Sequence, residues 1–480
     1  MMKKTLVQIC LSVLIAIFVL ACHDNPAHQS DTNTTGQSDT NLTGDSHSNN
    51  SNENGSNEIP VNKIFGEVQP PKVCSLKNKK QFVYDLFHDS YLWANITKEV
   101  DFEDNSTYPD EEVLLKDLRY EKDHFSFIMK KKDYDNFFEA GKNIGFGFEF
   151  AFVGDTTSVE SIIVLLVYPD SPAAKIGLKR SDEILSIDGK SADEIYHDDT
   201  LLDHYFYDDK NLSVSIKVRH SDSSVEELNI TKKEFDFKTV IVDKVLDIEQ
   251  KKIGYLLFQS FVGTSEQELN DAFNHFHQEG IDELVLDLRY NGGGYVYIAN
   301  HLASLIGGYK TAGKVFQNQL FNAKYSNYND TVYFENEAPQ SLALDRVFIL
   351  TTNNSCSASE LVINGLRALV TGIDVVQIGE ATCGKPYGMI GGAYCDKYIL
   401  PVQMKSTNGD NVGDYVDGLT PACSAKDDVF DDFTDQKETL FAQALYYIKN
   451  DHCKNVSSRS FVRGTIFDRR ANFRSRFGIY

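Results

Sequence analysis

Apolar positions repeat with two periods in the second half of the chain and predict strands that alternate with helices. Short apolar runs rich in β-branched and aromatic residues, as in buried strands, occupy residues 254–258, 284–288 and 346–351. Apolar side chains at helical spacing occupy residues 266–280, 295–306 and 361–370. Because such alternation is typical of βαβ units on a parallel sheet, we predict an α/β domain over residues 237–453.

A helical pattern also marks the region before residue 143. Between residues 77 and 95, apolar side chains recur at i, i+4, which predicts an amphipathic helix. Trp93, the only tryptophan, is expected to lie in the core. With a second aromatic stretch at residues 134–140, the pattern predicts a small helical N-terminal domain over residues 61–142.

The first residues have the pattern of an export signal. A basic start precedes an apolar run over residues 5–20 that is short for a membrane span and contains a glutamine. The following Val-Leu-Ala-Cys, which ends at Cys22, resembles a bacterial lipobox, whose cysteine is lipidated and becomes the mature N-terminus. We therefore expect a lipoprotein signal peptide over residues 1–22 and a lipid anchor to a bacterial membrane in the cell envelope, facing the periplasm or the surface. Ordinary signal cleavage near Ala21 is the alternative.

Residues 23–60 are dominated by Asn, Ser, Thr, Asp and Gly. A segment of this composition cannot bury apolar surface, so we expect a disordered tether. A disordered spacer after a lipidated cysteine would hold a folded domain away from a membrane.

The charge of the chain is strongly acidic, with 47 basic and 70 acidic residues and a net charge of −23. This surplus argues against nucleic acid and against an anionic membrane surface as partners. The end of the chain differs, because residues 454–480 form a tail with arginines from Arg459 to Arg476. The sequence assigns no role to this basic tail.

Candidate chemistry centres on the turn between the predicted strand 346–351 and the helix that follows it. Ser357 and Glu360 have the spacing of a capping box, which places Ser357 at the helix N-cap. The first N–H groups of a helix have no internal partner and carry partial positive charge. A hydroxyl beside such amides suits attack on a carbonyl carbon, although a serine in this pattern is most often a plain cap.

A second apolar run, residues 375–378, leads through Gly384 into Lys385, whose amine could serve as a base. A lysine base must be neutral, whereas the ordinary pKa of lysine is about 10.4. Burial would have to lower this pKa by about 3 units, or about 4 kcal/mol of differential solvation. Its neighbours, Gly384, Pro386 and Tyr387, include no acid that would hold the charge.

A glycine turn supplies a third element. The strand at residues 284–288 leads through Arg289 into Gly292-Gly293-Gly294 before the next predicted helix. Glycines let backbone amides approach a ligand closely. A nucleotide-binding loop is the alternative, but the stretch contains neither G-x-G-x-x-G nor G-x-x-x-x-G-K-[ST].

These elements, in this order, resemble the carboxyl-terminal processing peptidases, serine proteases that use a Ser–Lys dyad and usually carry a PDZ domain. The matching blocks are Leu286–Gly294, Ser355–Glu360 and Gly379–Lys385, and the resemblance extends from about residue 75 to residue 425. It implies an α/β multidomain fold with a crotonase-like βαβ catalytic core.

The resemblance also implies roles for single residues. Ser357 would be the nucleophile and Lys385 the general base, and the amide of Ala358 would contribute to an oxyanion hole. Family members often carry proline at the position of Gly292, and proline has no N–H, so Gly293 is the favoured second donor. The resemblance implies no metal and no cofactor.

Three features depart from the family pattern. Met389 stands where family members frequently have a glutamine that orients the lysine, so another group must position Lys385. The segment between the dyad residues is slightly longer than usual around residues 371–374, which an αβ loop tolerates at little cost. Ala422 replaces the usual aspartate of a G-x-x-P-D-like segment.

Residues 143–236 contain a second resemblance. A glycine-rich stretch, residues 143–148, precedes Ser171–Leu178 and Asp182–Gly189, and the set is similar to a PDZ domain. Such a loop captures a C-terminal carboxylate with backbone amides while a sheet edge adds the peptide as a strand. The resemblance implies that the substrate-binding residues are Ile144, Gly145, Phe146 and Gly147. A structural hairpin with glycines at its turns is the alternative.

Six cysteines remain after Cys22, and six allow about 15 pairings. Cys356 and Cys383 flank the two dyad candidates and should lie close together if the dyad forms, as two buried thiols in preference to a disulfide. Cys356 as a nucleophile is disfavoured because no histidine stands in a partner motif. The chain contains neither H-E-x-x-H nor C-x-x-C, which disfavours zinc.

The sequence thus predicts an exported serine endopeptidase that cleaves the C-terminal regions of proteins, with the substrate tail held by the PDZ domain. Protein or peptide substrates would be its partners, together with a membrane through the lipid anchor. A non-catalytic peptide-binding lipoprotein of the same fold is the first alternative, favoured by Met389. A crotonase-like acyl-CoA enzyme is the second, and the export signal argues against it.

Overall fold

The structure is a computed structural model that describes residues 65–155, 158–207, 211–454 and 465–467. The predicted signal peptide, Cys22, the predicted tether 23–60 and most of the basic tail lie outside these residues. No described helix is both long and apolar enough to cross a membrane.

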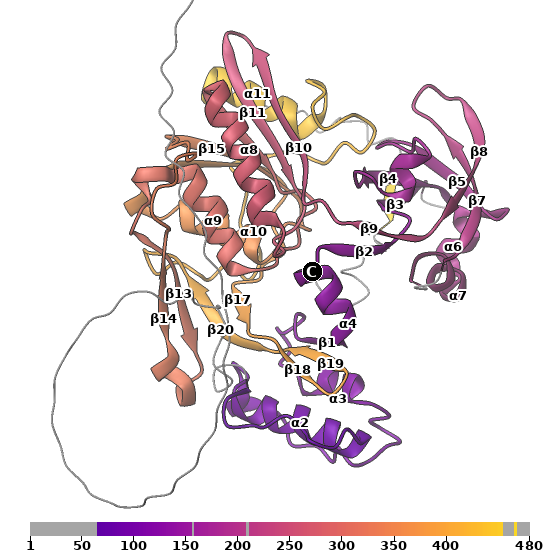
Figure 1. The fold of residues 1–480 in the computed structure, drawn as a ribbon, viewed down its shortest axis with the longest axis vertical. Helices are drawn as coiled ribbons and strands as arrows, with labels where there is room; N and C mark the ends of the chain where they lie inside the picture. Colours follow the sequence, from indigo (N-terminus) through magenta and orange to yellow (C-terminus); the bar gives the residue numbers. More distant parts are fainter. Residues whose placement is uncertain (1–64, 156–157, 208–210, 455–464, 468–480) are drawn as a thin grey trace, which may run out of the picture. The chain divides into compact units, whose positions relative to one another are not determined.

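A six-stranded sheet carries the candidate site (Figure 1). Its order is β10-β11-β12-β15-β16-β21, with β10 antiparallel to β11 and the other neighbours parallel. The strands are β10 (Val240–Ile248), β11 (Lys251–Phe258), β12 (Glu283–Asp287), β15 (Arg346–Thr351), β16 (Asp374–Gly379) and β21 (Cys423–Ser424). This parallel core confirms the predicted α/β architecture.

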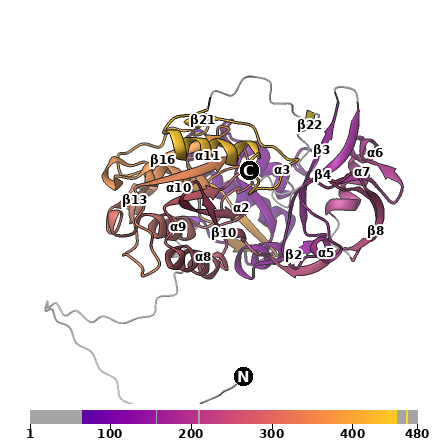
Figure 2. The ribbon, with the colours of Figure 1, turned by 90° about the horizontal axis from the view of Figure 1, so that it is seen from above.

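Helices cover both faces of this sheet. Figure 2 shows α8 (Ser265–Glu279) and α9 (Val296–Gly307) on one side and α11 (Thr439–Asn450) on the other. Successive side chains of a strand point to opposite faces. Tyr255 of β11 therefore packs against Phe441 of α11, with ring centroids 5.2 Å apart, whereas its neighbour Leu256 belongs to the core on the helix α8 side.

The candidate serine helix is α10 (Ala358–Leu366), which follows β15 and is buried along its whole length. It packs in the same core as α8 and α9. It begins directly after Ser357, the predicted N-cap, and the apolar run predicted to continue to residue 370 ends in a short 3-10 helix, η6 (Leu369–Thr371).

The region before residue 143 is less purely helical than predicted. It contains α2 (Leu76–Asp89), η1 (Ala94–Ile96), α3 (Glu111–Leu118), α4 (Lys131–Tyr134) and η2 (Asp135–Glu139). It also contains β1 (Phe127–Lys130), which pairs with β19 (Lys397–Leu400) and through it with β18 (Gly392–Tyr394). A disulfide between Cys74 and Cys395 joins the same two regions, so their core is shared.

The segment after the candidate lysine leads into a four-stranded sheet. Its order is β14-β13-β20-β17. The strands are β13 (Val315–Phe321), β14 (Asp330–Tyr333), β17 (Tyr387–Met389) and β20 (Val402–Thr407). Because β17 begins two residues after Lys385 and pairs with β20, this sheet fixes the direction in which the lysine segment leaves the site.

Residues 148–231 build a separate sheet around their own apolar core. Its order is β22-β3-β4-β5-β7-β8, and the outermost strand, β22 (Thr465–Phe467), comes from the basic tail. The other strands are β3 (Phe148–Gly154), β4 (Val159–Val167), β5 (Glu183–Ile187) with β6 (Lys190–Ser191) beside it, β7 (Ser213–Arg219) and β8 (Val225–Thr231). The short helices are α5 (Pro172–Lys175), α6 (Ala192–His197) and α7 (Asp199–Leu202). In the chain, β2 (Lys142–Gly145) comes before this sheet and β9 (Lys233–Asp236) comes after β8. The two strands pair with each other as a two-stranded ladder.

Candidate active site

Ser357 lies at the N-cap of α10 in an unusual backbone conformation. Its φ is 57° and its ψ is −110°, in a region that residues with a side chain seldom adopt. Such a conformation costs about 1–3 kcal/mol and persists only where the surroundings impose it. The N–H of Ala358, the first residue of α10, has no acceptor within the described parts of the chain. A polarised donor is therefore free next to the candidate nucleophile.

Glu360 is the group that holds this turn. Its carboxylate is fully buried, and Oε2 accepts from the backbone N–H groups of Ser357 and Lys385, each at 2.9 Å. Its other oxygen, Oε1, accepts from the N–H of Gly384 at 2.8 Å and from the hydroxyl of Thr382 at 2.6 Å. Burial raises the pKa of Glu360, while these four donors oppose the shift. One carboxylate thus joins the serine turn to the lysine segment.

Lys385 is buried, with 3% of its surface exposed. Its Nζ lies 5.2 Å from the centre of the Phe125 ring and donates to Sδ of Met389 at 3.8 Å. Burial lowers the pKa of Lys385 to about 8, against the opposing charges of Asp123 and Glu360. The direction of this shift is the one that the sequence required of a lysine base, and it leaves a substantial fraction of the amine neutral near pH 8.

The two dyad candidates are therefore brought together through their backbones. In the part of the chain that the structure describes, Lys385 Nζ makes no hydrogen bond to Ser357 Oγ, and Met389 Sδ is its acceptor. A thioether sulfur is a weak acceptor and a flexible one. Met389, which stands in place of the family's glutamine, is thus the acceptor that the amine has in this structure.

A disulfide crosses the same site. Cys356, directly before Ser357, is bonded to Cys383, two residues before Lys385, with Cα atoms 5.2 Å apart. The expectation of two buried thiols is therefore wrong, although the expected proximity is correct. The pair also lies within 4.8 Å of a Glu360 oxygen, but disulfide sulfurs offer no thiolate to a metal ion.

The glycine turn lies against the serine turn. Gly293 has a φ of 101°, and a Cβ there would meet Ser357 Cβ at 2.8 Å and the nitrogen of Ala358 at 3.0 Å, so only glycine fits. Its N–H donates to Oδ1 of Asn291 at 2.9 Å, while the carbonyl of Asn291 accepts from the N–H of Cys356 at 3.0 Å. Gly293 thus lies directly against Ser357 and Ala358, with its amide held by Asn291.

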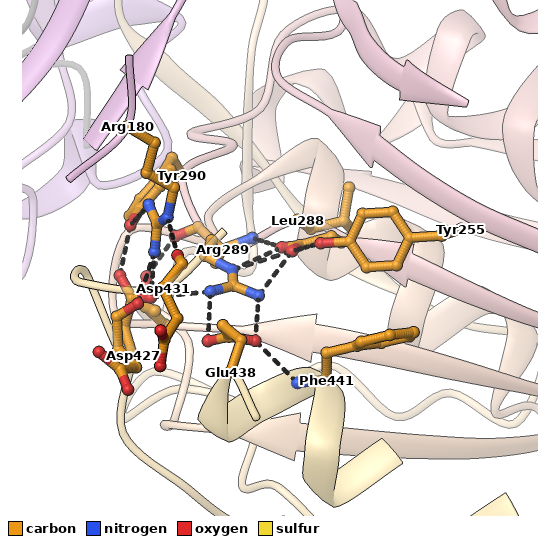
Figure 3. A network of polar contacts seen from close by, with 12 residues as sticks. Arg180, Tyr255, Leu288, Arg289, Tyr290, Asp427, Asp431, Glu438 and Phe441 are labelled. Atoms are coloured by element: carbon orange, nitrogen blue, oxygen red, sulfur yellow. Dashed lines mark hydrogen bonds and ion pairs between the residues drawn. The ribbon is translucent and has the colours of Figure 1, made fainter. Parts of the chain in front are cut away.

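A buried charge network fixes the start of this turn (Figure 3). Arg289 is fully buried; its Nε donates to Asp287 Oδ2 at 2.9 Å, and its Nη1 donates to Glu438 at 2.8 Å. Nη1 also donates to Asp427 at 2.8 Å, a residue that Arg180 contacts as well, at 3.2 Å. These carboxylates hold the pKa of Arg289 above its ordinary value in spite of its burial.

The sequence pattern placed Arg289 directly after a strand but did not identify the partners of its side chain. Glu438, the N-cap of α11, and Asp427 are 149 and 138 residues away from Arg289 in the chain, and neither belongs to a motif. Arg180 joins the network from the segment between α5 and β5 and donates to Tyr290 at 2.9 Å. Figure 3 shows Arg180, Tyr290 and Asp427 gathered on one side of Arg289.

The predicted carboxylate-binding residues are divided between a strand and a turn. Ile144 and Gly145 belong to β2 and lie opposite Glu234 and Lys233 of β9. The carbonyl of Phe146 accepts from Ala173 N at 2.9 Å, and that of Gly147 accepts from Tyr168 N at 3.0 Å. All four residues directly precede β3.

Trp93, which was expected in the core, is half-buried and packs against the core of the N-terminal region. Its ring centroid lies 5.0 Å from that of Tyr387, two residues after Lys385. It lines a cavity of about 200 Å³, together with Ile96, Thr97, Lys98, Asp117, Leu118, Arg119, Tyr120 and Glu121. As the only tryptophan of the chain, Trp93 is a natural fluorescent reporter for this side of the site.

Residues 252–406, which contain the serine turn, the lysine and the glycine turn, match peptidase family S41. The chain carries a peptidase family S41 domain. This domain includes the predicted blocks from Leu286 to Lys385. The resemblance inferred from the ordered blocks is therefore confirmed at the level of the family.

Two curated proteases are similar to about half of the chain. The chain is 26% identical over 231 residues to a "Carboxyl-terminal-processing protease" of Picosynechococcus sp., covering 47% of this chain and 51% of that protein. It is 26% identical over 256 residues to a "Probable CtpA-like serine protease" of Staphylococcus aureus strain COL, covering 53% of this chain and 47% of that protein. The chain thus spans about half the length of the curated relatives that it matches.

The fold also resembles a crystal structure of a protein named as an S41 protease from Bacteroides fragilis NCTC 9343. The TM-score is 0.64 at 21% identity, and the match covers 80% of this chain and 99% of that protein. This likeness extends the common fold beyond the S41 domain to most of the described residues.

Proposed function

We propose that the protein is an exported serine endopeptidase that cleaves the C-terminal regions of proteins with a Ser357–Lys385 dyad. The observation that carries the proposal is the buried Lys385, whose pKa is lowered to about 8 in a segment that Glu360 joins to the serine turn. A buried lysine with a lowered pKa beside a strained serine is an arrangement suited to nucleophilic catalysis. The names of the two relatives, a carboxyl-terminal-processing protease and a CtpA-like serine protease, support the same class of reaction.

In this mechanism, neutral Nζ of Lys385 turns from Met389 and takes the proton of Ser357 Oγ. The serine oxygen attacks the peptide carbonyl carbon, and the amides of Ala358 and Gly293 stabilise the oxyanion. The Gly293 amide becomes available when its bond to Asn291 Oδ1 opens. Protonated Lys385 then donates its proton to the leaving amine, and water hydrolyses the acyl-enzyme. The proposal includes no metal and no cofactor.

We further propose that residues 143–236 act as a PDZ domain that holds the substrate tail. The glycine-containing stretch before β3 and the position of β3 next to the outermost strand of its sheet, the short β22, support this role. Lipidation at Cys22 would place the peptidase at a bacterial membrane, with proteins or peptides as substrates.

A non-catalytic peptide-binding lipoprotein is the second candidate. One observation favours it: Lys385 Nζ donates to Met389 and not to Ser357 in the described structure. Such a protein would keep the peptide-binding edge without turning over a substrate.

Cleavage of an unstructured protein tail by the purified chain separates the two candidates. Ser357→Ala and Lys385→Ala should each abolish cleavage, because each removes a group that takes part in the reaction. Ser326→Ala and Lys437→Ala, at exposed positions, are matched controls and should cleave at the rate of the unmodified chain. Equal cleavage by all variants would show a contaminating protease, and absence of cleavage by the unmodified chain would favour the binding protein.

A further inference from the structure

Strand β22 comes from the basic tail and lies on the outer edge of β3 (Figure 2). The two strands are antiparallel, with Thr465 opposite Gly154, Ile466 opposite Val153 and Phe467 opposite Phe152. The other edge of β3 pairs with β4 along its whole length. Within the described residues, the tail therefore completes the side of this sheet.

The edge of β3 that β22 occupies is the edge to which a bound peptide would add as a strand. β3 begins directly after Ile144–Gly147, the residues proposed to receive a carboxylate. A peptide held in this way adds to the exposed sheet edge as a strand, and main-chain hydrogen bonds supply much of the affinity. Each residue of the β3 edge can pair with one strand at a time. β22 and a substrate tail that reaches Phe152–Gly154, the end of β3 farther from Ile144–Gly147, therefore exclude each other there.

Charge favours the same contact. Residues 454–480 contain seven basic residues and one acidic residue, whereas residues 143–236 contain nineteen acidic and nine basic residues. A basic segment attached to the same chain is therefore attracted to this acidic sheet, more strongly at low ionic strength. Threonine, isoleucine and phenylalanine, the residues of β22, also favour the extended strand conformation.

We propose that residues 465–467 are an internal ligand of the β3 edge, and that a substrate tail must displace them before it binds. This inference rests on the proposed peptide-binding role of residues 143–236 and adds its regulation. Only the free edge can bind a peptide. The apparent affinity for the peptide is therefore reduced in proportion to the fraction of the time that the edge is free. If β22 occupies it about nine-tenths of the time, peptide binding is about tenfold weaker than the edge allows.

Amide hydrogen exchange tests the contact itself. Ile466→Pro removes an N–H and breaks the strand, whereas Ile466→Val keeps both and is the matched control. In Ile466→Pro, and in a chain that ends at Lys454, those amides of Phe152–Gly154 that face β22 and not β4 should exchange at least tenfold faster than in the full chain. In Ile466→Val they should not. Equal exchange in all four proteins would overturn the proposal.

Peptide affinity tests the competition, with every protein in the Ser357→Ala background so that no cleavage is needed. The probe is a fluorescein-labelled unstructured peptide of about 12 residues with a free, apolar C-terminal residue. We expect Ile466→Pro and the shortened chain to bind it about tenfold more tightly than the full chain and Ile466→Val. A synthetic peptide of residues 459–476 should weaken binding to the shortened chain, more so in low salt.

Two binding results would overturn the proposal. Equal affinity of the four proteins, with faster exchange in Ile466→Pro, would place the substrate peptide elsewhere than on the part of the β3 edge that β22 occupies. No binding by the shortened chain would remove the peptide-binding role of residues 143–236 as well. Because neither readout depends on turnover, a failure of the proposed peptidase reaction would leave both tests unaffected.

Discussion

The backbone N–H of Ser357 and the backbone N–H of Lys385 donate to the same atom, Oε2 of Glu360, each at 2.9 Å. The serine stands at the start of a helix and the lysine 28 residues later in the chain, in a segment that leads into a different sheet. One buried carboxylate therefore sets the separation of the two groups on which the proposed chemistry depends.

Replacement of this carboxylate should disturb both stability and catalysis. Glu360→Gln turns one acceptor oxygen into an NH₂ group that faces backbone N–H donors, so we expect a loss of about 2 kcal/mol in the free energy of unfolding. We also expect kcat/KM to fall at least tenfold, because the dyad is no longer held. Glu337→Gln, at an exposed position, is the control. Denaturant unfolding and peptide cleavage measure the two effects, and normal cleavage by Glu360→Gln would contradict the assigned role.

The lowered pKa of Lys385 predicts the pH dependence of the reaction. The neutral amine is the proposed base, and burial brings its pKa to about 8. The value of kcat/KM should therefore rise with pH and reach half of its plateau near pH 8. A rate that is constant from pH 6 to pH 9 would argue against Lys385 as the base.

The same pKa predicts how stability varies with pH. Between pH 8 and the ordinary pKa of about 10.4, the unfolded chain binds more protons at this site than the folded chain, so the free energy of unfolding rises with pH. Below this window the buried charge costs about 3 kcal/mol. Lys385→Met removes the charge and keeps most of the volume. We expect this variant to be more stable than the unmodified chain at pH 7, with the difference shrinking at pH 10. Denaturant unfolding of both proteins at pH 7 and pH 10 provides the measurement. An equal difference in the free energy of unfolding at the two pH values would contradict the lowered pKa of Lys385.

The disulfides offer a matched pair for testing the site. Cys356–Cys383 closes a separation of 27 residues beside the dyad, and Cys423–Cys453 closes one of 30 residues beside β21. Loops of similar length should contribute similarly to stability, about 3 kcal/mol each. Loss of either disulfide should therefore cost a similar free energy of unfolding.

Activity should separate the two disulfides. The double variant Cys356→Ser/Cys383→Ser should lose at least tenfold in kcat/KM under conditions where it stays folded, because the serine and lysine segments are less firmly joined. Cys423→Ser/Cys453→Ser should retain its activity under the same conditions. Similar activity in the two double variants would mean that Glu360 alone holds the site.

Local patterns predicted the parts of the site that depend on neighbouring residues. The N-cap at Ser357, the glycines before α9 and the strands of the central sheet all follow from spacing within a few residues. The order of the blocks then identified the family, because three weak motifs in sequence are more specific than any one of them.

Contacts between distant segments could not be read in this way. The pairing of β1 with β19, and of β3 with β22, joins residues that are hundreds of positions apart, and alternation within a strand does not name its neighbour. The cysteine pairing was open for the same reason, and the expectation of free thiols at Cys356 and Cys383 was wrong. The position of Lys385 Nζ against Met389 also depends on packing that only the folded chain defines.

Met389 provides a direct test of how the amine is oriented. In Met389→Gln, an amide oxygen, which is a better acceptor than sulfur, stabilises the charged amine and raises the pKa of Lys385. We expect the rise of kcat/KM to move to higher pH and its plateau to increase, since the amine is better oriented. In Met389→Leu the acceptor is lost, so the rise should move to lower pH and the plateau should decrease. Identical pH profiles for the two variants would show that residue 389 does not orient the base.

Arg289 should be the residue whose loss the domain tolerates least. Arg289→Met would leave Asp287 and Glu438 buried, with Asp427 beside them, and without their shared positive partner. An unpaired buried charge costs about 3–5 kcal/mol, whereas Tyr255→Phe removes a single hydrogen bond to Asp287 and should cost about 1 kcal/mol.

Because Arg289 and Tyr290 lead directly into the glycine turn, loss of activity in Arg289→Met should accompany unfolding. The triple change Arg289→Met/Asp287→Leu/Glu438→Leu removes the charges together and should recover part of the lost stability but not the activity. Denaturant unfolding of the three variants tests this order of stabilities. An Arg289→Met variant as stable as the unmodified chain would show that the buried carboxylates bind protons in place of the lost arginine.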